Sequence, residues 1–237
     1  MVVEIGPGRG VLTRQLAKRA ARVLAIEIDD NIVASLVHEF QDQPHVDILA
    51  ADAREVDIQS LVAPDVTYKL VANLPYYAAS PIIRRFLESA HKPQLMVVMV
   101  QREVAKRMTA APGKMRVLSV AVQLYGKCRI VASVPPRAFR PAPKVTSAVV
   151  RIDVFPRPAL ELDSEERFFE LVRAGFSSPR KQLANSLRHG LSIPADDVEE
   201  MLIKAGIDRR RRPQSLGLTE WGSLYDARRH VCPSSEG

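Results

Sequence analysis

The sequence predicts an α/β protein: a doubly wound parallel sheet followed by a small all-helical C-terminal domain. Three observations support this fold class. Short apolar runs alternate with helical patterns as far as about Phe155, which is typical of a parallel sheet covered on both faces. Two later β-type runs then follow each other with no helix between them. Only helical signals follow Pro156-Arg157-Pro158, which breaks the pattern.

Nearly continuous apolar runs predict five buried parallel strands, at residues 2–5, 23–28, 46–50, 68–72 and 95–100. Between them, helical patterns predict helices at residues 12–19, 31–40 and 80–90. The two later runs, residues 128–134 and 147–155, predict an antiparallel edge pair joined by the proline-rich connection 135–144.

The proline-rich break divides the chain into two expected domains, residues 1–156 and residues 157–237. In the second domain, Ser164 and the following acids predict the start of a helix that continues to Arg173. Further helices are expected at residues 194–204 and 219–229. This domain has no net charge, although residues 209–212 form a local arginine cluster.

Composition excludes several classes of protein. A chain of 237 residues with 46% hydrophobic content can bury a real core. No apolar run reaches the roughly 18 residues that a membrane helix needs, and no signal peptide is recognisable. The two cysteines, Cys128 and Cys232, are far apart and lack paired histidines, so we expect neither a disulfide scaffold nor a metal site. These features predict a soluble, cytoplasmic protein.

The net charge of +7 is concentrated in one stretch between Arg102 and Lys144, which holds ten basic residues and a single acid, Glu103. The stretch therefore carries +9, and the rest of the chain carries −2. Such a block attracts phosphate backbones, but a solvated basic face explains the charge equally well. The basic residues are Arg102, Lys106, Arg107, Lys114, Arg116, Lys127, Arg129, Arg137, Arg140 and Lys144.

Polar groups follow three successive predicted strands at their carboxyl ends. The glycine-rich loop that begins at Gly6 joins the first strand to a helix, so its backbone can approach a ligand closely. Glu27 ends the second strand, where an acid accepts hydrogen bonds from ribose hydroxyls. Asp52 follows the third strand and is placed to accept from an adenine amine, although such an aspartate is more often a helix cap. Together they favour a ligand that contains adenosine.

The fourth strand runs into Asn73-Leu74-Pro75-Tyr76, a turn stiffened by its proline. The side-chain oxygen of Asn73 and a backbone carbonyl can hold the two hydrogens of an exocyclic amine, while Tyr76 offers a face on which a base can stack. A plain strand-to-helix turn with a buried tyrosine is the alternative.

This turn, following Glu-Ile-Gly-Pro-Gly-x-Gly, resembles the ribosomal RNA adenine dimethyltransferase family of the small-subunit type. Segments at residues 101–108, 118–120, 134–151 and 176–187 are also similar to the family, so the likeness covers almost the whole chain. The resemblance implies a Rossmann-like class I methyltransferase domain. It also implies S-adenosylmethionine as methyl donor, and dimethylation of two adjacent adenines in a small-subunit rRNA hairpin during ribosome biogenesis. The expected partner is this rRNA within pre-ribosomal particles, and the expected state is a monomer.

The resemblance also assigns residues. At the cofactor it places Gly6, Gly8, Glu27, Ile28, Asp52, Ala53 and Asn73. At the target adenine it places Asn73, the Leu74 carbonyl and Tyr76, with Phe139 stacking on the opposite face of the base. We expect RNA contacts from Arg102, Lys106, Arg107, Lys114, Arg116, Arg137, Arg140, Lys144, Arg180 and Lys181.

One departure from the family pattern is the absence of an N-terminal Gln-x-Phe-Leu segment that helps to cover the cofactor, because the sequence begins inside the first strand. The absence has two interpretations, a gene start that has been placed too late or a real truncation, and it bears on cofactor affinity. Three alternatives stay open: a large-subunit rRNA methyltransferase of the antibiotic-resistance type, a catalytically impaired RNA-binding assembly factor, and, more distantly, a nicotinamide-dependent oxidoreductase.

Overall fold

The computed structural model describes residues 1–231, which form two compact units. The first unit comprises Met1–Lys106 and Tyr125–Arg157, and the second comprises Arg107–Leu124 together with the chain from Pro158 onward. Cys232 lies outside the described residues. Among residues 1–231, no helix is both long enough and apolar enough to cross a membrane.

This division differs from the expected one at residues 1–156 and 157–237 in one respect: residues 107–124 group with the C-terminal helices. Backbone hydrogen bonds explain the grouping. The N–H groups of Gly113 and Met115 both donate to the carbonyl of Gln214, and the N–H of Ala159 donates to that of Leu124. These pairings are distant in sequence, so local patterns do not reveal them.

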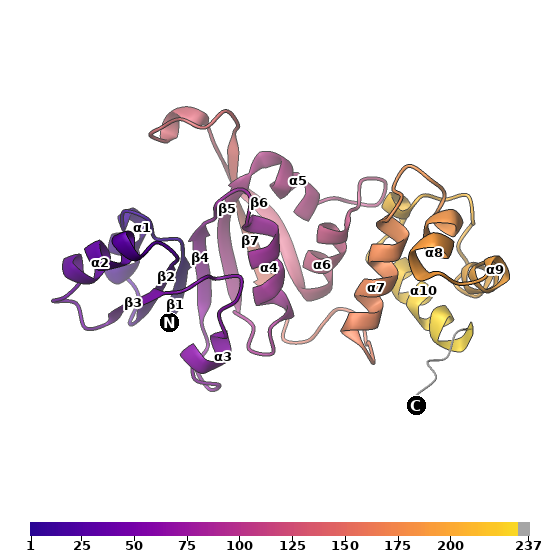
Figure 1. The fold of residues 1–237 in the computed structure, drawn as a ribbon, viewed down its shortest axis with the longest axis horizontal. Helices are drawn as coiled ribbons and strands as arrows, with labels where there is room; N and C mark the ends of the chain where they lie inside the picture. Colours follow the sequence, from indigo (N-terminus) through magenta and orange to yellow (C-terminus); the bar gives the residue numbers. More distant parts are fainter. Residues whose placement is uncertain (232–237) are drawn as a thin grey trace. The chain divides into compact units, whose positions relative to one another are not determined.

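One mixed sheet of seven strands forms the core of the first unit, in the order β3-β2-β1-β4-β5-β7-β6 (Figure 1). Strands β1 to β5 are parallel, and β7 runs antiparallel to both of its neighbours. The strands are β1 (Val2–Ile5), β2 (Val23–Glu27), β3 (Val46–Ala50), β4 (Lys69–Asn73), β5 (Leu95–Gln101), β6 (Gly126–Val134) and β7 (Ser147–Val154).

The predicted α/β class, all seven predicted strands and the antiparallel edge pair of the two later runs are confirmed. Strand β6 lies at the edge, whereas β7 is inserted between β5 and β6. Alternate residues of β7, Ala148, Val150 and Ile152, are buried, which is the pattern of an interior strand with one face on the core.

The predicted helices are also present, with ends shifted by a few residues, and others appear that the sequence patterns did not indicate. These are the short α3, α5 and α6, and α8 in the second unit. The helices are α1 (Val11–Ala17), α2 (Asp30–Glu39), α3 (Ile58–Leu61), α4 (Ala79–Glu88), α5 (Arg102–Met108), α6 (Val117–Tyr125), α7 (Glu165–Phe176), α8 (Leu183–Leu191), α9 (Ala195–Lys204) and α10 (Leu218–Val231).

Helices α7 to α10 confirm the expected helical region, in which Trp221 is fully buried and stacks on Phe176 with ring centroids 5.5 Å apart. Gly175 makes room for this indole, since a Cβ at that position would lie 2.4 Å from the Trp221 ring. A second close approach lies between α8 and α7, where a Cβ on Gly190 would lie 2.6 Å from the Cα of Ala174.

The strand register brings several distant segments to one edge of the sheet. Asn73 at the end of β4 pairs with Met99, and Gln101 at the end of β5 pairs with Ser147 at the start of β7. Ser147 also pairs with Val134 at the end of β6. The β6–β7 connection, residues 135–146, therefore leaves from the same edge as the carboxyl ends of the parallel strands, and it projects beyond the sheet (Figure 1).

Candidate cofactor and adenine site

The loop between β1 and α1 has the left-handed backbone that its glycines permit. Gly6 and Gly8 have φ values of 66° and 54°, a conformation that residues with a Cβ rarely adopt. The Gly6 N–H donates to the carbonyl of Ile26, and a Cβ on Gly6 would lie 3.8 Å from the backbone oxygen of Asn73. The loop thus lies directly at the carboxyl ends of β2 and β4.

Glu27 is held rigidly at the end of β2. Its Oε2 accepts from the Gly8 N–H at 3.2 Å, and its Oε1 accepts from the N–H groups of Ile28 and Asp29 at 2.9 and 3.2 Å. A carboxylate offers about four acceptor positions, so roughly one stays available after these three bonds. Glu27 is therefore positioned to accept from a ligand hydroxyl at the mouth of the crevice.

A cavity of about 70 Å³ lies at this edge of the sheet. Of the residues predicted to bind the cofactor, five line it, while Gly8 and Asn73 do not. The cavity also has wall residues with no assigned sequence role, among them Arg54, whose guanidinium pairs with Asp52, and Tyr77, which is 80% exposed. The five predicted lining residues are Gly6, Glu27, Ile28, Asp52 and Ala53.

The turn after β4 leaves two oxygen acceptors free. The Leu74 N–H donates to the carbonyl of Met99, and the Leu74 side chain is buried, so the turn is anchored to the sheet. The Asn73 side chain is exposed. Within residues 1–231, neither its amide group nor the Leu74 carbonyl has a hydrogen-bond partner. The Asn73 side chain is therefore not turned into the protein interior.

Tyr76 is half-buried, and its hydroxyl lies 2.8 Å from the Ser147 hydroxyl at the start of β7. This bond fixes the tyrosine ring relative to the sheet edge. Phe139 is half-buried on the β6–β7 connection, where its N–H donates to the carbonyl of Pro136 and ends a short 3₁₀ turn. It shares the sheet edge with Tyr76, and neither residue lines the cavity.

The glycine loop, the turn after β4 and the sheet order occur together in a known protein family. The family described as ribosomal RNA adenine dimethylase matches residues 1–226. The chain belongs to the ribosomal RNA adenine dimethylase family. It is therefore an rRNA adenine dimethyltransferase, and the sheet order is that of the class I methyltransferase fold.

Three relatives from this family, each named ribosomal RNA small subunit methyltransferase A, are similar over nearly the whole chain. The protein of Dehalococcoides mccartyi is 44% identical over 94% of this chain and 77% of its own length. That of Clostridium perfringens is 42% identical over 96% and 80%. That of Desulfitobacterium hafniense is 45% identical over 95% and 81%.

Two solved structures agree with the fold. The 23S rRNA methyltransferase ErmE is 29% identical, with a TM-score of 0.70 over 95% of this chain and 89% of its own. A dimethyladenosine transferase from Plasmodium falciparum has a TM-score of 0.79 at 23% identity, over 97% and 90%. The second likeness supports the fold alone.

Glu4 is a buried acid in the dimethylase core to which the sequence patterns assigned no role. It pairs with Ala25 on one side and Val71 on the other, and it is 1% exposed. Its Oε2 and the Thr13 hydroxyl are both buried, and neither has a hydrogen-bond partner among residues 1–231. Burial raises the pKa of Glu4 to about 7, opposed by the nearby Thr13 hydroxyl and reinforced by the Glu27 charge.

All ten residues expected to contact RNA are exposed. In the first unit, the N–H of Arg102 donates to the carbonyl of Thr146, which ties the start of α5 to the end of the β6–β7 connection at the site edge. Lys106 is partly neutralised by Glu103 at 2.8 Å. The first unit carries Arg102, Lys106, Arg137, Arg140 and Lys144; the second carries Arg107, Lys114, Arg116, Arg180 and Lys181.

The arginine cluster at residues 209–212 is partly structural. Arg209 pairs with Glu199 at 2.9 Å, and Arg211 pairs with Glu220 and also binds the backbone oxygen of Ser215. Two of the four guanidinium groups therefore stabilise the helical unit.

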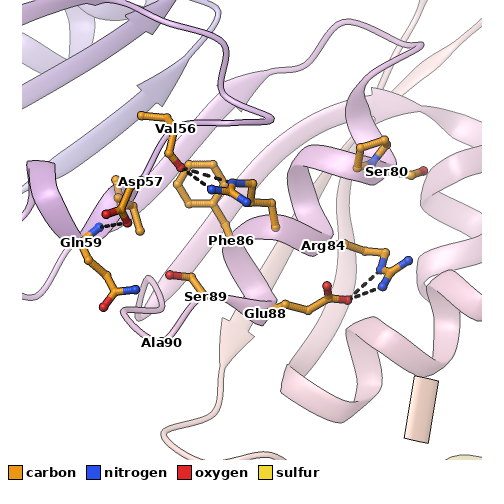
Figure 2. Close-up of a pocket in the computed structure, with 12 residues that line it drawn as sticks. Val56, Asp57, Gln59, Ser80, Arg84, Phe86, Glu88, Ser89 and Ala90 are labelled. Atoms are coloured by element: carbon orange, nitrogen blue, oxygen red, sulfur yellow. Dashed lines mark hydrogen bonds and ion pairs between the residues drawn. The ribbon is translucent and has the colours of Figure 1, made fainter. Parts of the chain in front are cut away.

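A second cavity in the first unit, of about 650 Å³, lies between α3 and α4 (Figure 2). Its charged side chains are engaged by the protein: Arg84 pairs with Glu88, and the Arg85 guanidinium binds the backbone oxygen of Val56. None of the predicted site residues lines it. We assign it no function.

Proposed function

We propose that this dimethyltransferase acts on small-subunit rRNA and transfers methyl groups from S-adenosylmethionine to the exocyclic amines of two adjacent adenines. The observation that carries the proposal is the pair of free acceptors on Asn73 and Leu74 beside an adenosine-type crevice. The 42 to 45% identity to small-subunit relatives, against 29% to a large-subunit enzyme, supports this choice of subunit.

The residues at the crevice fit S-adenosylmethionine. Glu27 retains an acceptor position for ribose hydroxyls, and the left-handed glycine loop leaves the backbone open to a close approach. The exposed Ile28 side chain offers an apolar surface for adenine, with Asp52 beside it as an acceptor for the adenine amine. When bound, the donor supplies an activated methyl group on a sulfonium.

The chain's own contribution to the reaction is positioning and electrostatics. The Asn73 side-chain oxygen and the Leu74 carbonyl accept the two hydrogens of the target amine, and so favour the partly positive nitrogen that develops during transfer. Alignment of reacting groups is worth roughly 7–11 kcal/mol in comparable cases. The singly methylated amine keeps one hydrogen, so one acceptor suffices for the second transfer. The released proton passes to water.

Tyr76 holds the target base by stacking, with its ring fixed through the Ser147 hydroxyl. Phe139 covers the opposite face of the base from the β6–β7 connection. An enzyme that acts on a base must take it out of the stack, or find it unpaired, and hold it between such faces. The basic residues around the same edge bind the phosphate backbone, and RNA shape adds specificity.

Methyl acceptance tests the proposal. Unmethylated small subunits and large subunits are each incubated with the full chain and methyl-labelled S-adenosylmethionine. We expect label only in small-subunit rRNA, recovered as dimethyladenosine at two adjacent positions. Label in large-subunit rRNA alone would instead identify the resistance type. A folded chain that binds rRNA but transfers no methyl group would be an assembly factor.

Neutralising three basic residues of α5 tests the RNA-binding face. Changing Arg102, Lys106 and Arg107 together to glutamine should weaken rRNA binding and make its salt dependence shallower by about two units, since each lost phosphate contact removes roughly 0.7–0.9. Filter binding between 50 and 300 mM KCl measures the slope.

The matched control changes Lys18, Arg19 and Arg22 to glutamine. These exposed residues lie at the opposite edge of the sheet and include one ion-paired member, Arg22 with Asp47, as the first set does. This control should keep the wild-type slope. Equal slopes in both triple variants would remove the first set from the RNA-binding face.

A further inference from the structure

Asp52 and Arg54 form an ion pair in the wall of the cofactor cavity. The Arg54 Nε lies 3.0 Å from Oδ1 and 2.9 Å from Oδ2 of Asp52, and its Nη2 lies 2.5 Å from Oδ2. The Arg54 backbone N–H also donates to Oδ1 at 2.8 Å. One residue therefore occupies both oxygens of this carboxylate. The Arg54 side chain is also the main cause that lowers the pKa of the Asp52 carboxyl.

The cavity that this pair borders is smaller than most small-molecule sites. It measures about 70 Å³, whereas small-molecule sites usually have roughly 300–1,000 Å³. The other acid in the wall, Glu27, is fixed by three backbone N–H groups. Arg54 is anchored differently: its side chain is 48% exposed, and Asp52 is its one ion-pair partner within residues 1–231. The Arg54 side chain can therefore move into solvent once this ion pair breaks.

We propose that Arg54 is an affinity-determining residue for the cofactor, because its guanidinium closes the adenine end of the cavity and competes for Asp52. An adenine amine takes its place on the carboxylate only after the guanidinium has moved into solvent. This inference rests on the proposed function, since it takes Asp52 as the acceptor for adenine.

Competition of this kind has a measurable signature. Exposed ion pairs are weak and are screened by salt, so added salt should release Asp52 and tighten ligand binding. S-adenosylhomocysteine is the suitable probe, because it carries the adenosine group and has no net charge near neutral pH. Its own long-range attraction to the protein therefore changes little with salt.

The experiment measures S-adenosylhomocysteine binding by calorimetry for the full chain and for Arg54→Met, at 50 and 500 mM KCl. At low salt, Arg54→Met should bind about two- to five-fold more tightly than the wild type, the range that corresponds to a typical exposed ion pair. The wild-type Kd should fall as salt rises, and that of Arg54→Met should change less.

Arg22→Met is the matched control. It removes the same charge and breaks a similarly exposed pair, with Asp47 at 2.9 Å, at the opposite edge of the sheet. Its Kd should equal the wild-type value. In an Asp52→Asn background, Arg54→Met should no longer tighten binding, because the competed carboxylate is gone.

An unchanged or higher Kd in Arg54→Met would overturn the inference, and wild-type binding in the same titration would leave the proposed function intact. If neither the wild type nor Arg54→Met binds the probe, both the inference and the cofactor site fail. Binding by Arg54→Met alone would support the inference in its strongest form.

Discussion

Asn73→Ala should lower the rate of methyl transfer by at least about 100-fold while the fold stays intact. The substitution removes one of the two oxygens that hold the target amine, and groups placed at a developing charge typically contribute 10²–10³ in rate. Because the Asn73 side chain is exposed and makes no hydrogen bond within the described residues, its loss should not unfold the sheet. Single-turnover transfer from labelled S-adenosylmethionine to unmethylated small subunits measures the effect.

Gln41→Ala is the control for this prediction. It removes an exposed side-chain amide that follows α2, before β3 begins, and so lies away from the carboxyl edge. It should leave turnover unchanged. Thermal unfolding and rRNA binding should match the wild type in both variants. Wild-type turnover by Asn73→Ala would refute the role of the asparagine and, with it, the proposed mechanism.

Glu4→Gln should stabilise the protein increasingly as pH rises. In the folded state the Glu4 carboxyl keeps its proton up to about pH 7, whereas in the unfolded chain it loses it near 4.5. Between these values the folded state binds more protons, so this residue makes the free energy of unfolding fall as pH rises. A shift of this size corresponds to about 3 kcal/mol. Glutamine has the same shape but no charge to bury.

Urea unfolding of the wild type and Glu4→Gln at several pH values between 4.5 and 8 measures this difference. The stability advantage of the variant should grow across that range by about 3 kcal/mol and then level off. Glu39→Gln, which removes a more exposed carboxylate paired with Arg14, should show no such growth. A pH-independent difference for Glu4→Gln would mean that Glu4 is not a buried acid with a raised pKa.

Much of the fold was predictable from residue order because its signals are local. Apolar runs of four to seven residues, separated by helical patterns, place β1 to β5, and a serine followed by two acids places the start of α7. The helices α5 and α6 were not predicted. Their apolar residues Met108, Val120 and Leu124 are fully buried.

The residues of the candidate site also divide into those that the sequence predicted and those that only the structure revealed. Glycines, Glu27, Asp52 and the Asn73 turn stand at strand ends, and parallel strands necessarily end at one edge, so their convergence follows from the sequence pattern. Arg54 and Tyr77 carried no such signal. They line the cavity because of where their long side chains lie in the folded protein, and the sequence pattern does not specify that position.

By itself, the sequence determined the fold class, the dimethylase motifs and the edge at which chemistry takes place, because periodicity, glycine loops and strand ends depend on neighbours along the chain. The tertiary structure alone decided that β7 lies inside the sheet, that residues 107–124 join the helical unit, that the Glu4 carboxyl is buried, and that Arg54 occupies Asp52. These features depend on burial and on contacts between residues from separate elements or turns, and such contacts exist only once the chain has folded.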